Sequence, residues 1–300
     1  MGQRGETMIY QADNRKREIA SLKTHIGNLL EELDFAGGKV SPIDRCFDKK
    51  ETLTGQCKTH GSFEQTRIWH EYAGRVSEKH SRCPDCISQD IQIAENSRRQ
   101  LQTDILLEEA FIPERFMKCE LSNYEACNAK AKENLSLVKA YVDGWAQMYA
   151  AGTSLIFSGK PGTGKNHLAV GLAKEIIRNH QASVLLTSVM RIIRAVRRTW
   201  EKDSERTESD LIEFYASRDL LIIDEVGIQY GSNSEMIILF DIMNTRYERM
   251  LPTVLISNLA PQEISATIGE RLTDRMVEGG GATLIFDWPS YRSQKGVAEV

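Results

Sequence analysis

The sequence predicts an α/β fold, in which helices flank a parallel sheet, preceded by a smaller helical N-terminal region. Two observations lead to this prediction. From residue 134 onward, short apolar segments alternate with longer segments whose apolar residues recur at helical spacing, which is typical of a parallel sheet covered on both faces. Residues 41–86 are instead polar and irregular. We therefore expect two domains, residues 1–110 and residues 111–300, a division that suits a chain of 300 residues.

The N-terminal domain should contain two helices separated by the polar segment. Residues 10–34 have apolar side chains at helical spacing, including Ile19, Leu22 and Ile26, and Gly37-Gly38 ends the pattern. Residues 87–110 predict a second helix that is polar at its start. The segment 41–86 between these helices is expected to have no regular secondary structure.

The C-terminal domain should contain five short apolar strands joined by helices. Strands are expected at residues 154–159, 183–188, 219–224, 253–258 and 283–288. Helices are expected at residues 135–152, 166–180, 189–202 and 235–250. Because the strands are almost continuously apolar, they should be buried on both faces of the sheet.

A glycine-rich loop follows the first strand and precedes a helix, which is the context of a phosphate-binding loop. The loop and the first residue after it are Gly159, Lys160, Pro161, Gly162, Thr163, Gly164, Lys165, Asn166 and His167. Its last two glycines let the backbone curl until several N–H groups point at one anion, and the start of the helix adds partial positive charge. Lys165 would contact the β- and γ-phosphates of ATP. A glycine-rich turn without function is the alternative, and an acidic strand end downstream argues against it.

Three residues are candidates for Mg²⁺ and for the attacking water. Asn166 replaces the Ser or Thr that usually contacts Mg²⁺ in such a loop, and the sequence leaves open whether its amide oxygen does so. Asp224 ends an apolar strand and is a candidate Mg²⁺ ligand, while Glu225 can polarise a water molecule. The alternative for this pair is a solvated acidic strand end.

Polar residues near the C-terminus also fit phosphoryl transfer. Asn258 ends the strand 253–258, where its side chain could orient water near the γ-phosphate. Arg271 and Arg275 are spaced one helical turn apart in GERLTDRM. An arginine supplied across a subunit boundary can stabilise the charged transition state. An exposed, ion-paired helix explains the same spacing equally well.

These motifs together resemble the DnaC-type replicative helicase loaders, which are AAA+ ATPases. Four segments carry the resemblance, which extends over about residues 111–295: FSGKPGTGKNHLA (157–169), LLIIDEVGIQ (220–229), GERLTDRM (269–276) and WPSYRS (288–293). The resemblance implies an AAA+ P-loop domain that binds ATP and Mg²⁺, hydrolyses ATP weakly, forms oligomers, holds single-stranded DNA and opens the ring of a replicative DNA helicase. It also implies that residues 112–125 lie beside the adenine.

The resemblance further implies a role for individual residues, and it assigns a helicase-binding role to the N-terminal region. Lys165 would bind phosphate, and Asp224 and Glu225 would bind Mg²⁺ and the attacking water. The first sensor, the arginine finger and the second sensor would be Asn258, Arg275 and Arg292.

A stripe of arginines is expected on the helix 189–202. At helical spacing, Arg191, Arg194 and Arg198 lie on one side, opposite an apolar face that includes Val196 and Trp200. The net charge of the chain is −4, so a local stripe of this kind is where a nucleic-acid backbone would bind. In the family that the chain resembles, a helix at this place faces single-stranded DNA. A solvated basic face is the alternative.

Two paired half-sites in the polar segment predict a structural zinc site. They are Cys57-x2-His60 and Cys83-x2-Cys86. Each spacing lets two side chains converge on one ion, and two pairs complete a tetrahedron. Unlinked thiols with a redox role are the alternative. A typical DnaC-type loader has no such segment, so the zinc site has no counterpart in the family that the chain resembles.

Composition limits the remaining choices. Hydrophobic residues make up 41% and charged residues 27%, as in soluble globular proteins. No apolar run reaches the length of a membrane span, so we expect a cytoplasmic protein without a membrane partner. Besides the helicase loader, two functions stay open: an IstB-like transposition helper ATPase and a P-loop kinase that phosphorylates a small molecule.

Overall fold

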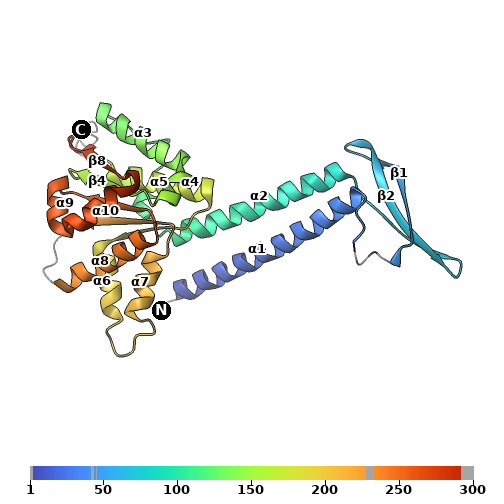
Figure 1. The fold of residues 1–300 in the computed structure, drawn as a ribbon, viewed down its shortest axis with the longest axis horizontal. Coiled ribbons are helices and arrows are strands. Elements are labelled where there is room, and N and C mark those ends of the chain that lie inside the picture. Colours follow the sequence, from blue (N-terminus) through green and yellow to red (C-terminus); the bar gives the residue numbers. More distant parts are fainter. Residues whose placement is uncertain (1–2, 42–43, 45, 228–232, 292–300) are drawn as a thin grey trace. The chain divides into compact units, whose positions relative to one another are not determined.

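The computed structural model describes residues 3–41, 44, 46–227 and 233–291 of the 300-residue chain. The chain divides into two compact units, residues 1–105 and residues 106–300, and each is described separately (Figure 1). In the described part of the chain, no helix combines the length and the apolar character needed to cross a membrane.

The N-terminal unit combines two long helices with a small antiparallel sheet. The helices are α1 (Gln3–Ala36) and α2 (Pro84–Glu109), and the strands are β1 (Lys49–Cys57), β2 (Gly61–Tyr72) and β3 (Arg75–His80), in the order β1-β2-β3. The two predicted helices are therefore confirmed, and α1 begins earlier than expected. The helices pack through a small apolar cluster that includes Leu29, Ala36 and Ile87.

The expectation that residues 41–86 lack regular structure is wrong. The strands of this sheet bury only one face, so their sequence is mostly polar and resembles that of a loop. On β2, Thr66 and Ile68 are buried and alternate with more exposed residues. The Thr66 hydroxyl donates to the carbonyl of Ala36 at the end of α1. The period of two was present in the sequence, but polar residues outnumbered the apolar ones that carry it.

The C-terminal unit contains the predicted parallel sheet. Its strands are β4 (Leu155–Gly159), β5 (Val184–Ser188), β6 (Leu220–Val226), β7 (Thr253–Ser257) and β8 (Ala282–Phe286). All adjacent pairs are parallel, in the order β5-β6-β7-β4-β8. The predicted α/β class and all five strands are confirmed, within one or two residues at each end.

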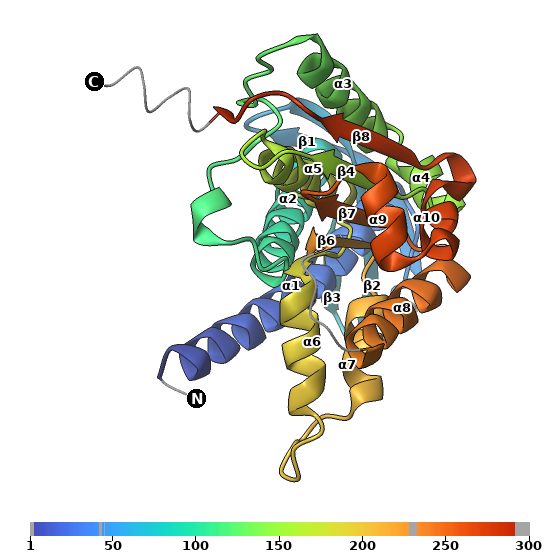
Figure 2. The same ribbon diagram turned by 90° about the vertical axis from the view of Figure 1, so that its left-hand side faces the viewer.

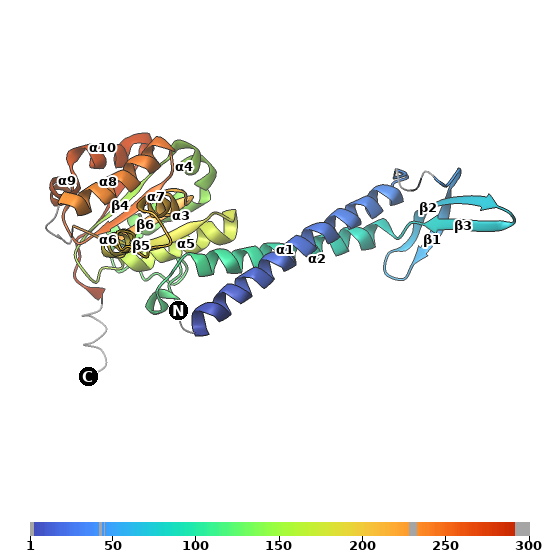
Figure 3. The same cartoon turned by 90° about the horizontal axis from the view of Figure 1, so that it is seen from below.

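Helices cover both faces of this sheet. They are α3 (Ala129–Asp143), α4 (Trp145–Ala151), α5 (Lys165–His180), α6 (Val189–Arg198), α7 (Glu208–Ala216), α8 (Asn233–Glu248), α9 (Pro261–Ile268) and α10 (Glu270–Val277). Figure 2 shows α3 beside β8 at one end of this unit and α6 with α7 at the other, and Figure 3 shows α8, α9 and α10 on one side of the sheet. Neighbouring residues of β4 point to opposite faces: Phe157 joins the core with α3 and α5, and Ile156 joins the core with α8 to α10.

Two expected helices have different bounds. The helix predicted at 135–152 begins earlier, where the Asn128 side chain accepts from the N–H of Ala131, and Gly144 divides it into α3 and α4. Asparagine caps helices well, and a glycine interrupts them. The helix predicted at 189–202 ends at Arg198.

A buried arginine ties α8 to the sheet. Arg246 is 1% exposed. Its guanidinium donates to the carbonyls of Ala216 at 3.1 Å and Arg218 at 2.6 Å, and to the Thr253 hydroxyl at 2.9 Å. The planar group thereby supplies a donor to two backbone carbonyls, at the end of α7 and before β6, and to the hydroxyl at the start of β7.

Candidate functional site

The phosphate loop has the expected backbone shape. It connects β4 to α5, and Gly159, Gly162 and Gly164 have φ angles of 135°, 77° and 96°. Residues that carry a side chain rarely adopt such positive φ angles, so glycine is required here. The space is also limited, because a Cβ on Gly162 would lie 2.1 Å from the Ser290 hydroxyl oxygen.

Lys165 is drawn into the loop that it follows. It is the first residue of α5 and is 5% exposed. Its ammonium donates to the carbonyls of Gly159 at 2.6 Å and Lys160 at 2.7 Å, while the Thr163 hydroxyl also donates to the carbonyl of Lys160. The cation is therefore held at the mouth of the loop, where phosphate oxygens could replace the two carbonyls.

The structure brings Asn166 and Asp224 together. The Asn166 side-chain amide donates to the Asp224 carboxylate at 2.5 Å. Asp224 and Glu225 lie at the carboxyl end of β6, and Glu225 is exposed with a φ of 60°. Since left-handed backbone is uncommon for glutamate, this turn is a strained position of the kind found at functional sites. The amide and the two carboxylates supply oxygen atoms of the type that bind Mg²⁺.

Asn258 directly follows β7 and is held by its two neighbours. The Ser257 hydroxyl donates to the carbonyl of Val226 on β6, and the Ser158 hydroxyl at the end of β4 donates to the carbonyl of Leu259. Because β7 lies between β6 and β4, these bonds fix Asn258 between Glu225 and the phosphate loop. Its side chain is exposed.

A cavity of 320 Å³ lies beside the phosphate loop. Its lining residues include Asn123, Tyr124, Thr163, Gly164, His167, Trp288 and Tyr291. The rings of Tyr124 and His167 meet edge to face, with centroids 5.3 Å apart. Burial raises the pKa of Tyr124 to about 12, so it stays neutral. An aromatic cavity next to a phosphate loop suits a nucleotide base.

Sequence reasoning missed three residues of this cavity: Tyr124, Trp288 and Tyr291. It placed residues 112–125 near the adenine as a segment and did not single out a ring. The signal was available, since Trp288 and Tyr291 lie in a segment that carried the resemblance and Tyr124 lies in residues 112–125, which the resemblance placed beside the adenine. Tyr291 also donates its backbone N–H to the carbonyl of Gly162 at 2.9 Å, so the C-terminal segment is bonded to the loop. The expected second sensor, Arg292, lies outside the described residues.

Arg275 faces away from the phosphate loop of its own chain. Its guanidinium stacks on Tyr247, 4.4 Å from the ring centroid, and donates to the Asn244 side chain. It lines a cavity of 380 Å³ together with Ser154 and Thr253, which lie at the amino ends of β4 and β7. The phosphate loop is at the carboxyl end of β4, and five residues of strand span about 16 Å. Arg271, one turn earlier, is exposed.

The predicted arginine stripe lies on α6. Arg191, Arg194 and Arg198 are exposed, and Ile192 and Val196 on the opposite side are buried. Trp200 was expected on the buried face, and that expectation is wrong. The helix ends before it, leaving the indole 54% exposed, with its N–H donating to Glu208 at 2.7 Å.

The four predicted metal ligands converge in the N-terminal unit. The ligand atoms of Cys57, His60, Cys83 and Cys86 all lie within 4.8 Å of one another. The Sγ atoms of Cys57, Cys83 and Cys86 lie 3.7, 3.6 and 3.4 Å from Nδ1 of His60, and Cys57 and Cys86 are 3.5 Å apart. Zinc bonds of about 2.0–2.3 Å in a tetrahedron require ligand separations of roughly 3.5–3.8 Å. The residues present therefore fit a zinc ion.

The local structure explains how these residues meet. Cys57 ends β1, and His60 occupies the turn before Gly61, whose φ is 77°. Cys83 precedes α2 and Cys86 lies in its first turn, so the second pair sits at a helix start that favours negative charge. The backbone N–H groups of Thr59 and His60 lower the pKa of Cys57 to about 6. The bond to Cys57, and then burial, raise the pKa of Cys86 to about 11.

Comparison with known proteins places these features in context. A family model described as an IstB-like ATP binding protein matches residues 96–280. The uncharacterized protein YdaV of Escherichia coli K12 is 31% identical over 240 residues, covering 79% of this chain and 90% of YdaV. The replicative helicase loader DnaC of Buchnera aphidicola (subsp. Acyrthosiphon pisum) is 34% identical over 76% of this chain and 86% of that protein. DnaC of Escherichia coli K12 is 37% identical over 59% and 70%, respectively.

Solved structures agree on the fold. The crystal structure of the DnaC helicase loader superposes with a TM-score of 0.52 at 18% identity, covering 58% of this chain and 99% of that one. Replication initiator DnaA bound to AMPPCP and single-stranded DNA gives 0.50 at 22% identity, covering 63% and 56%. These similarities confirm the predicted AAA+ fold.

Proposed function

This chain belongs to the IstB/DnaC-like family of ATP-binding proteins, and from that premise we propose that it loads a replicative DNA helicase onto single-stranded DNA in an ATP-dependent manner. The observation that carries the proposal is the match to relatives named replicative helicase loader, one of which is 34% identical over 86% of its length. Helicase loading is the activity in the names of those relatives, and it is proposed here for this chain.

ATP would bind with its base in the aromatic cavity and its phosphates on the loop. Lys165 would leave the carbonyls of Gly159 and Lys160 and donate to phosphate oxygens. Mg²⁺ would supply charge neutralisation of the phosphates, held by Asp224 with Asn166 beside it. Glu225 would orient and polarise the attacking water.

Asn258 would report the state of the γ-phosphate. It lies between Glu225 and the loop on a backbone that hydroxyl groups hold from both sides. A change at the γ-phosphate can therefore be passed to β6 and β7 together. Hydrolysis is expected to be slow in the isolated chain, because Arg275 does not reach the ATP of its own chain and the transition state therefore lacks a positive group.

The missing positive group would come from a second copy. Arg275 lies towards the amino ends of the strands, and the phosphate loop lies at the carboxyl end, so Arg275 is suited to reach a neighbour's ATP and not its own. An arginine supplied in trans is worth about 10³–10⁵ in rate in other P-loop proteins. The chain would thus form an oligomer that hydrolyses ATP at subunit boundaries.

Single-stranded DNA would bind along α6. Three exposed arginines offer contacts to phosphates, and the exposed indole of Trp200 adjoins them at the end of the helix. Base stacking on an aromatic ring and charge along the backbone are the two elements of sequence-independent binding to single strands.

The N-terminal unit would bind the helicase, and its zinc ion would be structural. Four protein ligands leave no open position for water, so the ion would supply a cross-link and no catalysis. The cross-link would join the β1–β2 turn to the start of α2 and so fix the sheet on the helices.

Co-purification with the replicative helicase, with and without ATP, tests the proposal. A loader retains the helicase, and retention depends on nucleotide. A transposition helper of the IstB type retains a transposase and binds duplex DNA instead, while a kinase yields a phosphorylated small product. Failure to retain the helicase of the same cell in either nucleotide state contradicts the proposal.

A further inference from the structure

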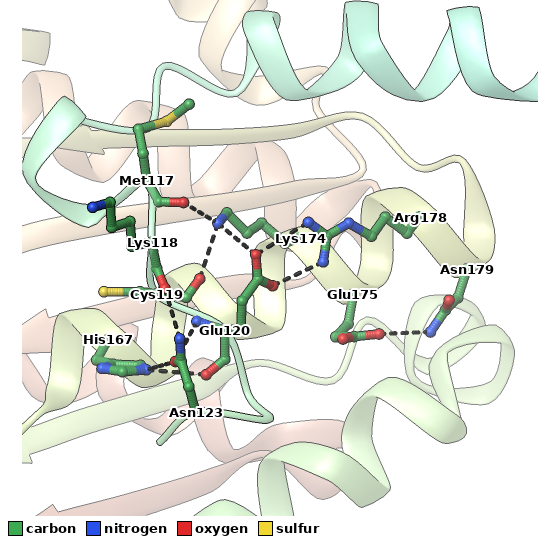
Figure 4. A network of polar contacts seen from close by, with 10 residues as sticks. All are labelled: Met117, Lys118, Cys119, Glu120, Asn123, His167, Lys174, Glu175, Arg178 and Asn179. Atoms are coloured by element: carbon green, nitrogen blue, oxygen red, sulfur yellow. Dashed lines mark hydrogen bonds and ion pairs between the residues drawn. The ribbon is translucent and has the colours of Figure 1, made fainter. Parts of the chain in front are cut away.

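A polar network fastens the segment before α3 to the helix that follows the phosphate loop. The segment is residues 117–124, called the base wall here because it ends at Tyr124 in the cavity. On α5, the residues that face it are spaced at helical intervals: His167, Gly171, Lys174 and Arg178. Figure 4 shows the polar contacts between the two.

Lys174 is the centre of the network. Only 3% of Lys174 is exposed, although lysine is rarely buried to this extent. The ammonium donates to the carbonyls of Met117 at 2.6 Å and Cys119 at 3.0 Å, and to the Glu120 carboxylate at 2.8 Å. All three donor positions of the amine are thereby used on one short stretch of chain, two on backbone carbonyls and one on the Glu120 carboxylate.

Glu120 is held from a second side. Arg178 donates to its two carboxylate oxygens at 2.8 and 3.1 Å. Burial alone would raise the pKa of Glu120, but the bonds from Arg178 and Lys174 outweigh it and hold the pKa below its usual range. The carboxylate is therefore charged, and the ion pairs are partly shielded from solvent.

The same stretch of chain reaches the cavity. The carbonyl of Glu120 and the side-chain oxygen of Asn123 lie 3.0 and 2.8 Å from Nε2 of His167. Between the two attachments, a Cβ on Gly171 would lie 2.8 Å from the backbone N of Leu121, so only glycine permits this approach. Tyr124 follows, and a Cβ on Gly164 in the phosphate loop would lie 2.9 Å from its ring.

We propose that Lys174, acting through Glu120 and Arg178, is a positioning group that fixes the base wall and thereby determines affinity for the nucleotide base. This inference rests on the proposed binding of ATP in the cavity. Lys174 is on the third turn of α5, and the cavity lining does not include it, so it acts on the base only through the wall. The phosphates contact the loop at the other end of the same helix, and their affinity should not depend on the wall.

The substitution Lys174→Met keeps an unbranched apolar stem of nearly the same length and removes the terminal amine with its charge and donors. Without the amine, the carbonyls of Met117 and Cys119 lose their donor. The base wall is then no longer fixed before binding, and binding of the base has to order it. Such ordering weakens binding. We expect the affinity for ATP to fall by about tenfold and the affinity for inorganic tripolyphosphate to change by less than about twofold.

Calorimetry of the full-length chain with ATP and with tripolyphosphate, both with Mg²⁺, measures the two affinities. The matched control is Lys130→Met, which breaks an exposed lysine–glutamate pair with Glu133 on α3. Glu120→Gln is a milder second variant, since its amide oxygen can still accept from Lys174, and we expect its ATP affinity to fall by about threefold.

The ratio of the two affinities decides the inference. An unchanged ratio in Lys174→Met and in Glu120→Gln overturns it, and if Lys174→Met does not fold, the ratio in Glu120→Gln decides alone. Failure of the unmodified chain to bind ATP contradicts the proposed function instead, so the two failures are distinguishable. If the affinities for ATP and for tripolyphosphate fall equally in a folded variant, Lys174 has a general structural role, and the inference is also overturned.

Discussion

Replacing two arginines of α6 tests the proposed DNA-binding surface most selectively. Arg194 and Arg198 are exposed, and the apolar side of their helix is buried in the core, so Arg194→Gln with Arg198→Gln should leave the fold intact. Glutamine removes the charge without adding the repulsion that glutamate would bring. The change therefore isolates the contribution of the two charges.

Counterion release sets the magnitude. Each phosphate contact on a single strand contributes about −0.7 to the slope of log affinity against log salt concentration. Losing two contacts should therefore reduce the steepness by about 1.4. Between about 50 and 200 mM salt, the loss of affinity in the variant should be about sevenfold smaller than in the unmodified chain.

Fluorescence anisotropy with a labelled oligo(dT) at several salt concentrations measures this slope. The control is Lys132→Gln with Lys139→Gln, which removes two exposed charges from α3, at the other end of the unit (Figure 2). The control should keep the slope of the unmodified chain. An unchanged slope in the α6 variant, with affinity retained at low and high salt, refutes DNA binding by this helix.

Three further predictions concern the metal site and stability. Protein purified without chelator should contain one zinc per chain, and Cys83→Ser with Cys86→Ser should lose it; plasma emission analysis that finds no zinc in the unmodified protein contradicts the site. Because cysteine binds zinc as the thiolate, protons compete with the ion, and the affinity for zinc should fall as the pH falls; an affinity that does not change with pH, followed with a zinc-sensitive dye, argues against thiolate ligation. Arg246→Met leaves the carbonyls of Ala216 and Arg218 without this donor and should lower the free energy of unfolding by about 2–6 kcal/mol, since each carbonyl left without a partner costs about 1–3 kcal/mol; a loss below about 1 kcal/mol in urea titration contradicts the role given to this arginine.

The sequence predicted the C-terminal unit well because local and long-range signals agree there. The strands are apolar on both faces, and the glycines of the phosphate loop have positive φ angles that only glycine adopts readily. The convergence of Cys57, His60, Cys83 and Cys86 was also predictable, because the x2 spacing is a local constraint that a turn and a helix start can each satisfy.

Other features depend on packing that a single sequence does not contain. The small sheet was missed because Thr66 and Ile68 are the few buried residues in a polar segment. The exposure of Trp200 depends on where α6 ends, and helix ends are the least predictable boundaries. The burial of Lys174 could not be predicted either, because its partners lie more than 50 residues away.

Helicase transfer onto circular single-stranded DNA is the direct test of ATP-dependent loading by this chain. The unmodified chain with ATP should transfer the helicase, measured as helicase that stays with the circle on gel filtration, and Lys165→Ala should not. Helicase transfer by Lys165→Ala at the rate of the unmodified chain, or equal transfer when this chain is left out, would contradict ATP-dependent loading.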